Sequence, residues 1–219
     1  MYPDAVLFDL DGTLIDTAPD FIYVLNTLLI KYQRPPLAEH IIRNSVSNGA
    51  GALITLGFGL CNKAKFDQYK ADLLELYSLH LGDNSQLFPG MDALLKKLES
   101  QHIPWGIVTN KPSKFTLPLL KALSLTQRCS VLVCADQVTE PKPAPEALLK
   151  ACDILNVKSE KSIYIGDHQR DIEAGQRAKM TTITALFGYI PENENPHLWQ
   201  AHHNASNATD ITHCIFGKQ

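Results

Sequence analysis

The chain has 219 residues, 45% of them hydrophobic and 20% charged, and carries a net charge of −3. This length is enough for one full hydrophobic core with a smaller companion unit. The lysines and arginines are scattered, so neither nucleic acid nor a membrane surface is expected as a partner. The five cysteines lack the two-residue spacing of zinc or redox motifs. With no targeting segment or membrane-spanning run in view, we expect reduced thiols and a cytoplasmic protein.

The first informative segment is the run AVLFDLDGTL at residues 5–14. A strand over 6–8 would project alternate side chains to one side, so we expect Asp9 and Asp11 to face one small volume. Gly12 lets the backbone turn away at that point. Two carboxylates can hold one magnesium, and an Asp carboxylate can attack phosphorus as a nucleophile. An Asp-Gly hairpin turn is the alternative for this segment alone.

A long helical segment follows the first strand. Apolar residues recur with helical spacing from Phe21 to Leu29, around Ile41 and Ile42, over residues 50–56, and from Phe66 to His80. Asp16 or Thr17 would cap the first helix, with Pro19 in its first turn. Four helices without strands predict a small bundle over roughly residues 17–82, beside the site that flanks it.

The rest of the chain alternates apolar runs with helical patterns. We expect strands at 105–109, 131–135, 163–166 and 182–186, separated by amphipathic helices. This alternation predicts an α/β fold with a Rossmann-like, doubly wound parallel sheet covered on both sides. Such sheets bind ligands beyond the carboxyl ends of their strands, which is where Asp9 and Asp11 fall.

Thr109 and Asn110 directly follow the second of these strands. A hydroxyl and a following backbone N–H at a strand end are good donors to phosphate oxygens. A turn or a helix cap is the alternative for such a pair.

Lys142 lies in the segment PKPAP at residues 141–145. The flanking prolines stiffen the backbone and restrict where the lysine points. This would suit an ammonium held near a nucleophile and a transferring phosphoryl group. A proline-rich loop with a solvated lysine is the alternative.

The segment IYIGDHQRD at residues 163–171 is a strand ending in Gly-Asp with a second Asp four residues later. At that spacing Asp167 and Asp171 can face the same ion, and magnesium prefers one or two carboxylates, phosphate and waters. Asp171 also fits a helix cap. We expect no metal ligation by His168, because a hard cation in a site of carboxylates does not need imidazole. We assign no functional role to the three histidines of the C-terminal segment, His202, His203 and His213.

These four segments, in this order and each at a strand end, closely resemble the haloacid dehalogenase-like hydrolases over nearly the whole chain. The resemblance implies a catalytic core of residues 1–16 and 83–219. It also implies that residues 17–82 are the helical cap of the phosphoglycolate phosphatase-like subgroup, which closes over the site and reads the substrate. That family usually has a final short strand near the end of the chain, whereas residues 202–209 are polar and poor in strand formers. We therefore expect a frayed sheet edge there.

The resemblance also implies a magnesium-dependent phosphomonoester hydrolase. Asp9 would be the nucleophile that forms an aspartyl-phosphate, and Asp11 the general acid and then the base. Lys142 would hold nucleophile and phosphate together, while Thr109 and Asn110 would bind phosphoryl oxygens. The implied Mg²⁺ ligands, direct or through water, are Asp9, Asp11, Asp167 and Asp171.

Two further segments concern the substrate, a small phosphorylated molecule. The stretch IRNSVSNGA at residues 42–50 resembles the arginine plus Gly-Asn-Gly-Ala stretch of phosphoglycolate phosphatases, with Ser47 replacing the first glycine. Arg43 would bind a substrate carboxylate bidentately, or it is an exposed helix arginine. The loop GYIPENENPHLW at 188–199 is similar to that of bacterial N-acetylmuramic acid 6-phosphate phosphatases. Its Tyr189 and Trp199 would either stack on a sugar or pack the loop.

N-acetylmuramic acid 6-phosphate is therefore the favoured substrate, with 2-phosphoglycolate as the alternative; both carry a carboxylate. The motifs also fit a phosphosugar mutase that returns the phosphoryl group to its substrate. A dehalogenase is disfavoured because that chemistry needs neither Asp11 nor magnesium. A binding protein with a dead site is disfavoured because the acidic residues and Lys142 are all present. We expect a monomer or a weak homodimer.

Overall fold

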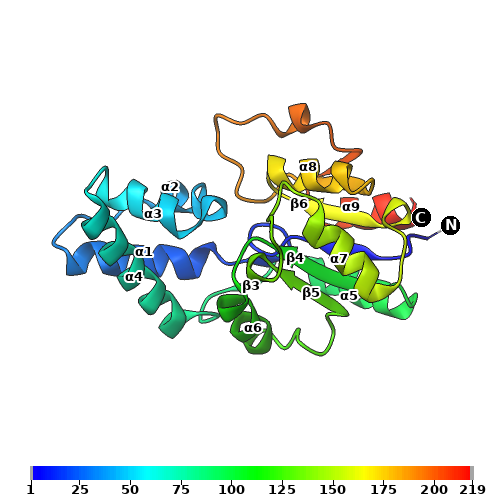
Figure 1. The fold of residues 1–219 in the computed structure, drawn as a ribbon, viewed down its shortest axis with the longest axis horizontal. Helices are drawn as coiled ribbons and strands as arrows, with labels where there is room; N and C mark the ends of the chain where they lie inside the picture. The colour runs from blue at the N-terminus through cyan, green and yellow to red at the C-terminus, as the bar shows by residue number, and fades with distance from the viewer. Residues whose placement is uncertain (1, 218–219) are drawn as a thin grey trace.

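The computed structural model describes residues 2–217 and contains a six-stranded sheet with a helical unit beside it (Figure 1). In spatial order the strands are β5 (Val131–Cys134), β4 (Trp105–Thr109), β1 (Val6–Phe8), β6 (Ile163–Gly166), β7 (Thr181–Ala185) and β8 (His203–Ala205). All neighbouring pairs are parallel, which confirms the predicted sheet. β1 lies at its centre, where Val6 is in register with both Trp105 and Ile163.

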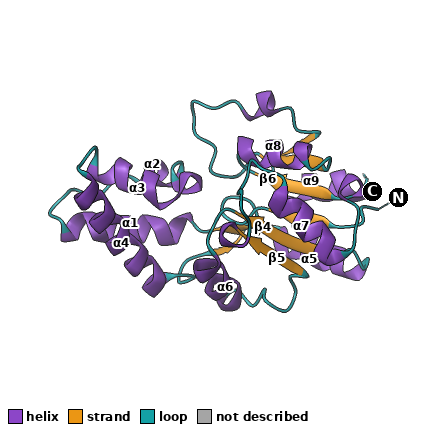
Figure 2. Ribbon diagram, viewed as in Figure 1, coloured by secondary structure: helices purple, strands orange, loops and turns teal. Residues whose placement is uncertain are grey.

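Helices cover both faces of this sheet (Figure 2). They are α5 (Met91–Ser100), α6 (Ser113–Ala122), α7 (Glu146–Leu155), α8 (Gln169–Arg177) and α9 (Ala208–Phe216). Successive residues of β1 point to opposite faces. Val6 and Phe8 join a core cluster with α5, α6 and α9, whereas Leu7 joins a second cluster with α7 and α8. All three side chains are fully buried, so the central strand is apolar on both faces, as parallel sheets require.

The expectation of a frayed edge over residues 202–209 is wrong. β8 pairs in parallel with β7, with His203 opposite Ile183 and Ala205 opposite Ala185. His203 and Asn204 are exposed and Ala205 is buried. An edge strand needs backbone pairing on one side only, and short polar strands blunt such edges, so side-chain propensity carried little signal here. Two predicted strand ends also shift by one residue, to Cys134 and Ala185.

The segment expected to be helical contains α1 (Ala18–Lys31), α2 (Glu39–Arg43), α3 (Gly49–Phe58) and α4 (Lys63–His80). We call residues 18–80, which contain these four helices, the helical unit; Figure 1 shows the helices grouped at one side of the sheet. α1 packs on α4, and the ring of Phe21 stacks on Tyr77 with centroids 4.1 Å apart. Across residues 2–217, no helix combines the length and apolarity needed to cross a lipid bilayer.

The chain passes between sheet and helical unit twice, and the two passages are fastened together. β2 (Ile15–Asp16) pairs antiparallel with β3 (Gln86–Leu87). Asp20, fully buried in the first turn of α1, receives three hydrogen bonds from the returning passage. Its donors are the backbone N–H groups of Gly82 (2.8 Å) and Asn84 (2.7 Å) and the Ser85 hydroxyl (2.5 Å). The helical unit is therefore connected to the sheet by two adjacent chain segments, the hinge, which are held together by β2–β3 pairing and by Asp20.

Candidate active site

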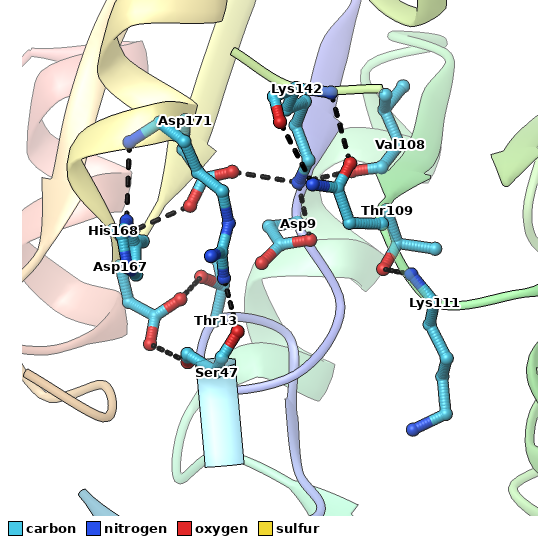
Figure 3. A network of polar contacts seen from close by, with 12 residues as sticks. Asp9, Thr13, Ser47, Val108, Thr109, Lys111, Lys142, Asp167, His168 and Asp171 are labelled. Atoms are coloured by element: carbon cyan, nitrogen blue, oxygen red, sulfur yellow. Dashed lines mark hydrogen bonds and ion pairs between the residues drawn. The ribbon is translucent and has the colours of Figure 1, made fainter. Parts of the chain in front are cut away.

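Three buried carboxylates meet at the carboxyl ends of β1 and β6. Asp9, Asp167 and Asp171 each offer one oxygen, and these oxygens all lie within 4.8 Å of one another (Figure 3). Gly12 closes over this group with a φ of +84°, and a Cβ there would lie 2.2 Å from Asp167 Oδ2. Glycine is needed at this turn for both reasons. Hard carboxylate oxygens in such a cluster fit a magnesium ion.

Lys142 places a buried ammonium beside the carboxylates. Its Nζ donates to Asp9 Oδ1 at 2.7 Å and lies 2.7 Å from Asp171 Oδ1. It also lies within hydrogen-bond distance of the Tyr164 hydroxyl (2.8 Å) and the Val108 carbonyl (3.1 Å). Burial alone would lower the pKa of Lys142, but the charges of Asp171 and Asp9 raise it above its usual value. The lysine is therefore a fixed cation directed at the predicted nucleophile.

The carboxylates outnumber this ammonium, and their pKa values reflect it. Burial raises the pKa of Asp9 to about 6 even though the Lys142 charge opposes the shift. Burial, followed by the charges of Asp9 and Asp171, raises the pKa of Asp167 to about 8. Each shift reports the cost of holding negative charge in a desolvated place. A bound cation would neutralise that charge.

Asp11 lies apart from this group. β1 ends at Phe8, so the alternation of a strand does not extend to Asp11, and its carboxylate does not join the other three. Its Oδ1 instead accepts hydrogen bonds from Thr17 Oγ1 at 2.6 Å and from Lys111 Nζ at 2.8 Å. The structure therefore does not place this carboxylate among candidate metal ligands, although Asp11 lines the same cavity as Asp9.

Thr109 and Asn110 both line the cavity at the end of β4. The Thr109 hydroxyl accepts a hydrogen bond from the Lys111 N–H at 3.1 Å. The Asn110 side chain makes two hydrogen bonds to the backbone of Lys142. Its Nδ2 donates to the carbonyl at 3.0 Å, and its Oδ1 accepts from the N–H at 3.1 Å. Asn110 thus holds the lysine segment in place, a role that the sequence did not indicate.

The cavity has a volume of about 480 Å³ and is walled by the sheet ends on one side and the helical unit on the other. Sequence reasoning missed several of its lining residues: Lys111, Arg170, Ser47 and Tyr77. Lys111 lies two residues past the end of β4, a position that could have marked it, whereas Arg170 lies in the first turn of α8. Tyr77 lies among apolar residues with helical spacing, a pattern typical of core packing, so the sequence around it did not indicate a role in the site.

Two contacts bring the helical unit onto the acidic cluster (Figure 3). The Ser47 hydroxyl donates to Asp167 Oδ2 at 3.2 Å. The guanidinium of Arg170, on α8, donates to the Ser47 carbonyl. The segment between α2 and α3 therefore lies directly over the carboxylates.

Arg43 does not reach the cavity. Its guanidinium binds Asp16 Oδ2 at 2.8 Å and lies 5.0 Å from the centre of the Tyr189 ring. It is absent from the cavity lining among residues 2–217. The expected role in binding a substrate carboxylate is not supported by this position, because the ion pair with Asp16 fixes the arginine elsewhere.

The aromatic residues of the 188–199 loop pack the loop onto the protein. The buried Tyr189 hydroxyl accepts from the backbone N–H groups of Thr17 (2.7 Å) and Ala18 (2.8 Å) and donates to Asp16 Oδ1 (2.7 Å). Trp199 stacks on His168 with ring centroids 6.3 Å apart. Of the two interpretations of these aromatics, packing is the one that the structure supports.

The comparisons with known proteins agree with this geometry. A sequence model of the haloacid dehalogenase-like hydrolases matches residues 6–185. The chain is 40% identical to an N-acetylmuramic acid 6-phosphate phosphatase of Pseudomonas putida, over 90% of this chain and 89% of that protein. It is 39% identical to a phosphoglycolate phosphatase of Xanthomonas campestris, over 91% and 90%. A crystal structure described as a predicted phosphoglycolate phosphatase from Haemophilus somnus superposes with a TM-score of 0.86 at 25% identity, over 96% and 97%.

The chain therefore belongs to the haloacid dehalogenase-like hydrolase family, as its sequence motifs indicated. Within that family it is an enzyme of the phosphatase class, because its similar relatives are named phosphatases. Those names refer to two substrates at nearly equal identity. Similarity alone therefore does not separate the two substrates.

Proposed function

We propose that this chain is a magnesium-dependent phosphomonoesterase that works through an aspartyl-phosphate on Asp9. The observation that carries the proposal is the ammonium of Lys142, 2.7 Å from Asp9 Oδ1 and fixed among buried carboxylates. A carboxylate held in this way is oriented to attack, and the ammonium offsets charge that develops on the transferring group.

The chain's own residues divide the reaction into two displacements. In the first, an Asp9 oxygen bonds to phosphorus while the ester bond breaks, and Asp11 gives a proton to the leaving oxygen. In the second, Asp11 takes a proton from the water that attacks the phosphoaspartate, and inorganic phosphate leaves. Thr109 and Asn110, which line the cavity, would bind the phosphoryl oxygens.

The ion fits the acidic cluster because the donors are hard oxygens carrying more negative charge than Lys142 balances. Asp9 and Asp167, with Asp171 directly or through water, would hold it. It would supply positive charge to the phosphoryl oxygens.

Residues 17–82 would form a cap domain over a core of residues 1–16 and 83–219. Support comes from the cavity, one wall of which is the helical unit, and from the contact between Ser47 and Asp167. A cap that excludes water strengthens the charge interactions beneath it.

N-acetylmuramic acid 6-phosphate is our favoured substrate. The cavity of about 480 Å³ is of the size that accommodates small organic ligands and leaves room for a phosphorylated sugar. The sequence of the loop at 188–199, which is similar to that of N-acetylmuramic acid 6-phosphate phosphatases, points the same way.

Side-by-side steady-state kinetics test this ranking. We expect a higher kcat/KM on N-acetylmuramic acid 6-phosphate than on 2-phosphoglycolate, with the difference visible in kcat as well as KM. A preference of about tenfold for 2-phosphoglycolate, worth about 1.4 kcal/mol, would reverse the ranking. Release of inorganic phosphate without a bisphosphate activator separates hydrolysis from mutase chemistry.

A further inference from the structure

Lys111 is a second buried ammonium that faces the cavity. Its side chain is 7% exposed, and its Nζ donates to Asp11 Oδ1 at 2.8 Å. The same atom lies 5.0 Å from the centre of the Phe21 ring and 4.8 Å from that of Tyr77. An ammonium has three N–H donors. Within residues 2–217, the hydrogen bond of Lys111 Nζ goes to Asp11, with the Tyr77 hydroxyl beside the same ammonium. At least one donor remains for a ligand.

Tyr77 adds a further donor at the same place. The residue is fully buried on α4 and lines the cavity. Its hydroxyl has no hydrogen-bond partner within residues 2–217. Buried hydroxyls are almost always paired, so an unpaired one that borders a cavity indicates a missing acceptor. The core thus contributes a cation, and the helical unit contributes a phenol, to one corner of the cavity.

We infer that Lys111 and Tyr77 form the subsite for the carboxylate of the substrate's leaving group. The inference rests on the proposed function, in which Asp11 protonates the leaving oxygen, so the corner beside Asp11 faces the leaving group. A carboxylate accepts several hydrogen bonds and matches the donors available there.

The charge of Lys111 also favours an anion over a neutral group. Lys111 is a buried cation at the cavity wall, and hydrogen bonds from an ammonium are stronger to a carboxylate than to a neutral oxygen. Arg43, the carboxylate ligand expected from the sequence, is paired with Asp16 outside the cavity.

The test uses two substrates that differ only in the lactyl ether carrying the carboxylate: N-acetylmuramic acid 6-phosphate and N-acetylglucosamine 6-phosphate. We expect the wild type to favour the first by about tenfold or more in kcat/KM. A second pair, 2-phosphoglycolate and 2-hydroxyethyl phosphate, compares kcat/KM with and without the carboxylate for the smaller substrate.

Two variants separate binding from folding. Tyr77→Phe removes only the unpaired hydroxyl, so Tm should be unchanged or higher. It should lower kcat/KM for the carboxylate substrate by about five- to twentyfold, mainly through KM, and leave the neutral partner within about twofold. Lys111→Met should bring the ratio between the two substrates close to one. Tyr69→Phe on the same helix and Arg43→Met, neither lining the cavity, should keep the wild-type ratio.

The possible failures are distinguishable. If the wild type hydrolyses neither pair, the proposed function falls and this inference falls with it. If it hydrolyses a pair but both subsite variants keep the wild-type ratio, the inference is overturned while the phosphatase stands. An equal loss on both members of a pair in Lys111→Met would mean that Lys111 acts through Asp11, which also overturns it.

Discussion

At the scale of single residues, the site is defined by negative charge held out of water. Three carboxylates share one corner with the ammonium of Lys142, and the pKa of Asp167 rises to about 8. Burying such a group of carboxylates costs free energy unless a cation neutralises its charge. The proposed nucleophile and the proposed metal ion therefore depend on the same few atoms.

Asp9→Asn should abolish turnover, lowering kcat by about 10³-fold or more, because an amide is not an anionic nucleophile. The amide fills the same volume, so the fold should persist. Phosphate release under saturating substrate measures the loss, and circular dichroism is the control for folding. Retention of more than a small fraction of wild-type activity would contradict the assigned mechanism.

Magnesium binding should release about one proton near pH 7, because Asp167, with a pKa of about 8, must ionise to bind. Calorimetry in buffers of different ionisation enthalpy would detect that proton, and the release should disappear near pH 10. Identical binding heats in all buffers at pH 7 would contradict this prediction.

The raised pKa of Asp167 also predicts how the stability of the metal-free protein depends on pH. The folded-state pKa of Asp167 lies above its ordinary value of 3.8, so its contribution to folding is most favourable below that pH. The contribution is lost as the pH rises towards about 8. Added magnesium should therefore raise Tm more at pH 8 than at pH 6.

At the scale of elements, the two passages between sheet and helical unit and the ends of the strands position the site residues. Much of this level was readable from the sequence, because buried parallel strands are continuous apolar runs and helices show their period. The polar strand β8 could not be predicted in this way, because it is stabilised by backbone pairing rather than by apolar side chains. The sequence also does not show that β1 stops at Phe8, and so it does not show that the carboxylate of Asp11 lies apart from the acidic cluster while lining the same cavity.

Asp20→Ala should destabilise the protein by about 2–5 kcal/mol, because three donors of the returning passage lose their buried acceptor. Urea denaturation monitored by fluorescence gives the free energy of unfolding. Asp67→Ala, which removes an exposed ion pair on α4, is the matched control and should cost less than about 1 kcal/mol. Equal effects in the two variants would mean that Asp20 does not fasten the hinge.

At the scale of the whole molecule, the site belongs to neither part alone. Its acids and Lys142 come from the segments around the sheet, whereas Ser47, Phe21 and Tyr77 come from the helical unit. Sequence motifs found the first group because its residues lie in short segments of recognisable composition. They missed the second, because which helix faces the site is decided by packing between distant segments.

Arg170→Met should loosen the helical unit locally, since it removes the hydrogen bond to the Ser47 carbonyl. Hydrogen exchange should quicken about five- to tenfold over residues 44–51, which corresponds to about 1–1.4 kcal/mol of lost local stability. β4 and β6 should keep their protection. Unchanged exchange over 44–51 would show that this contact does not hold the segment down.

The central place of β1 sets the order in which the parts can fold during synthesis. Val6 pairs with Trp105 and Ile163, residues that leave the ribosome long after it. At about 5–20 residues per second, the first strand waits on the order of ten seconds or more for its last neighbour. The helical unit is fully synthesised before β6 emerges. Pairing of β2 with β3, which brings residues 16 and 86 together, would shorten the loop between β1 and β4. Early formation of this pair would therefore lower the entropic cost of joining β1 to its neighbours in the sheet.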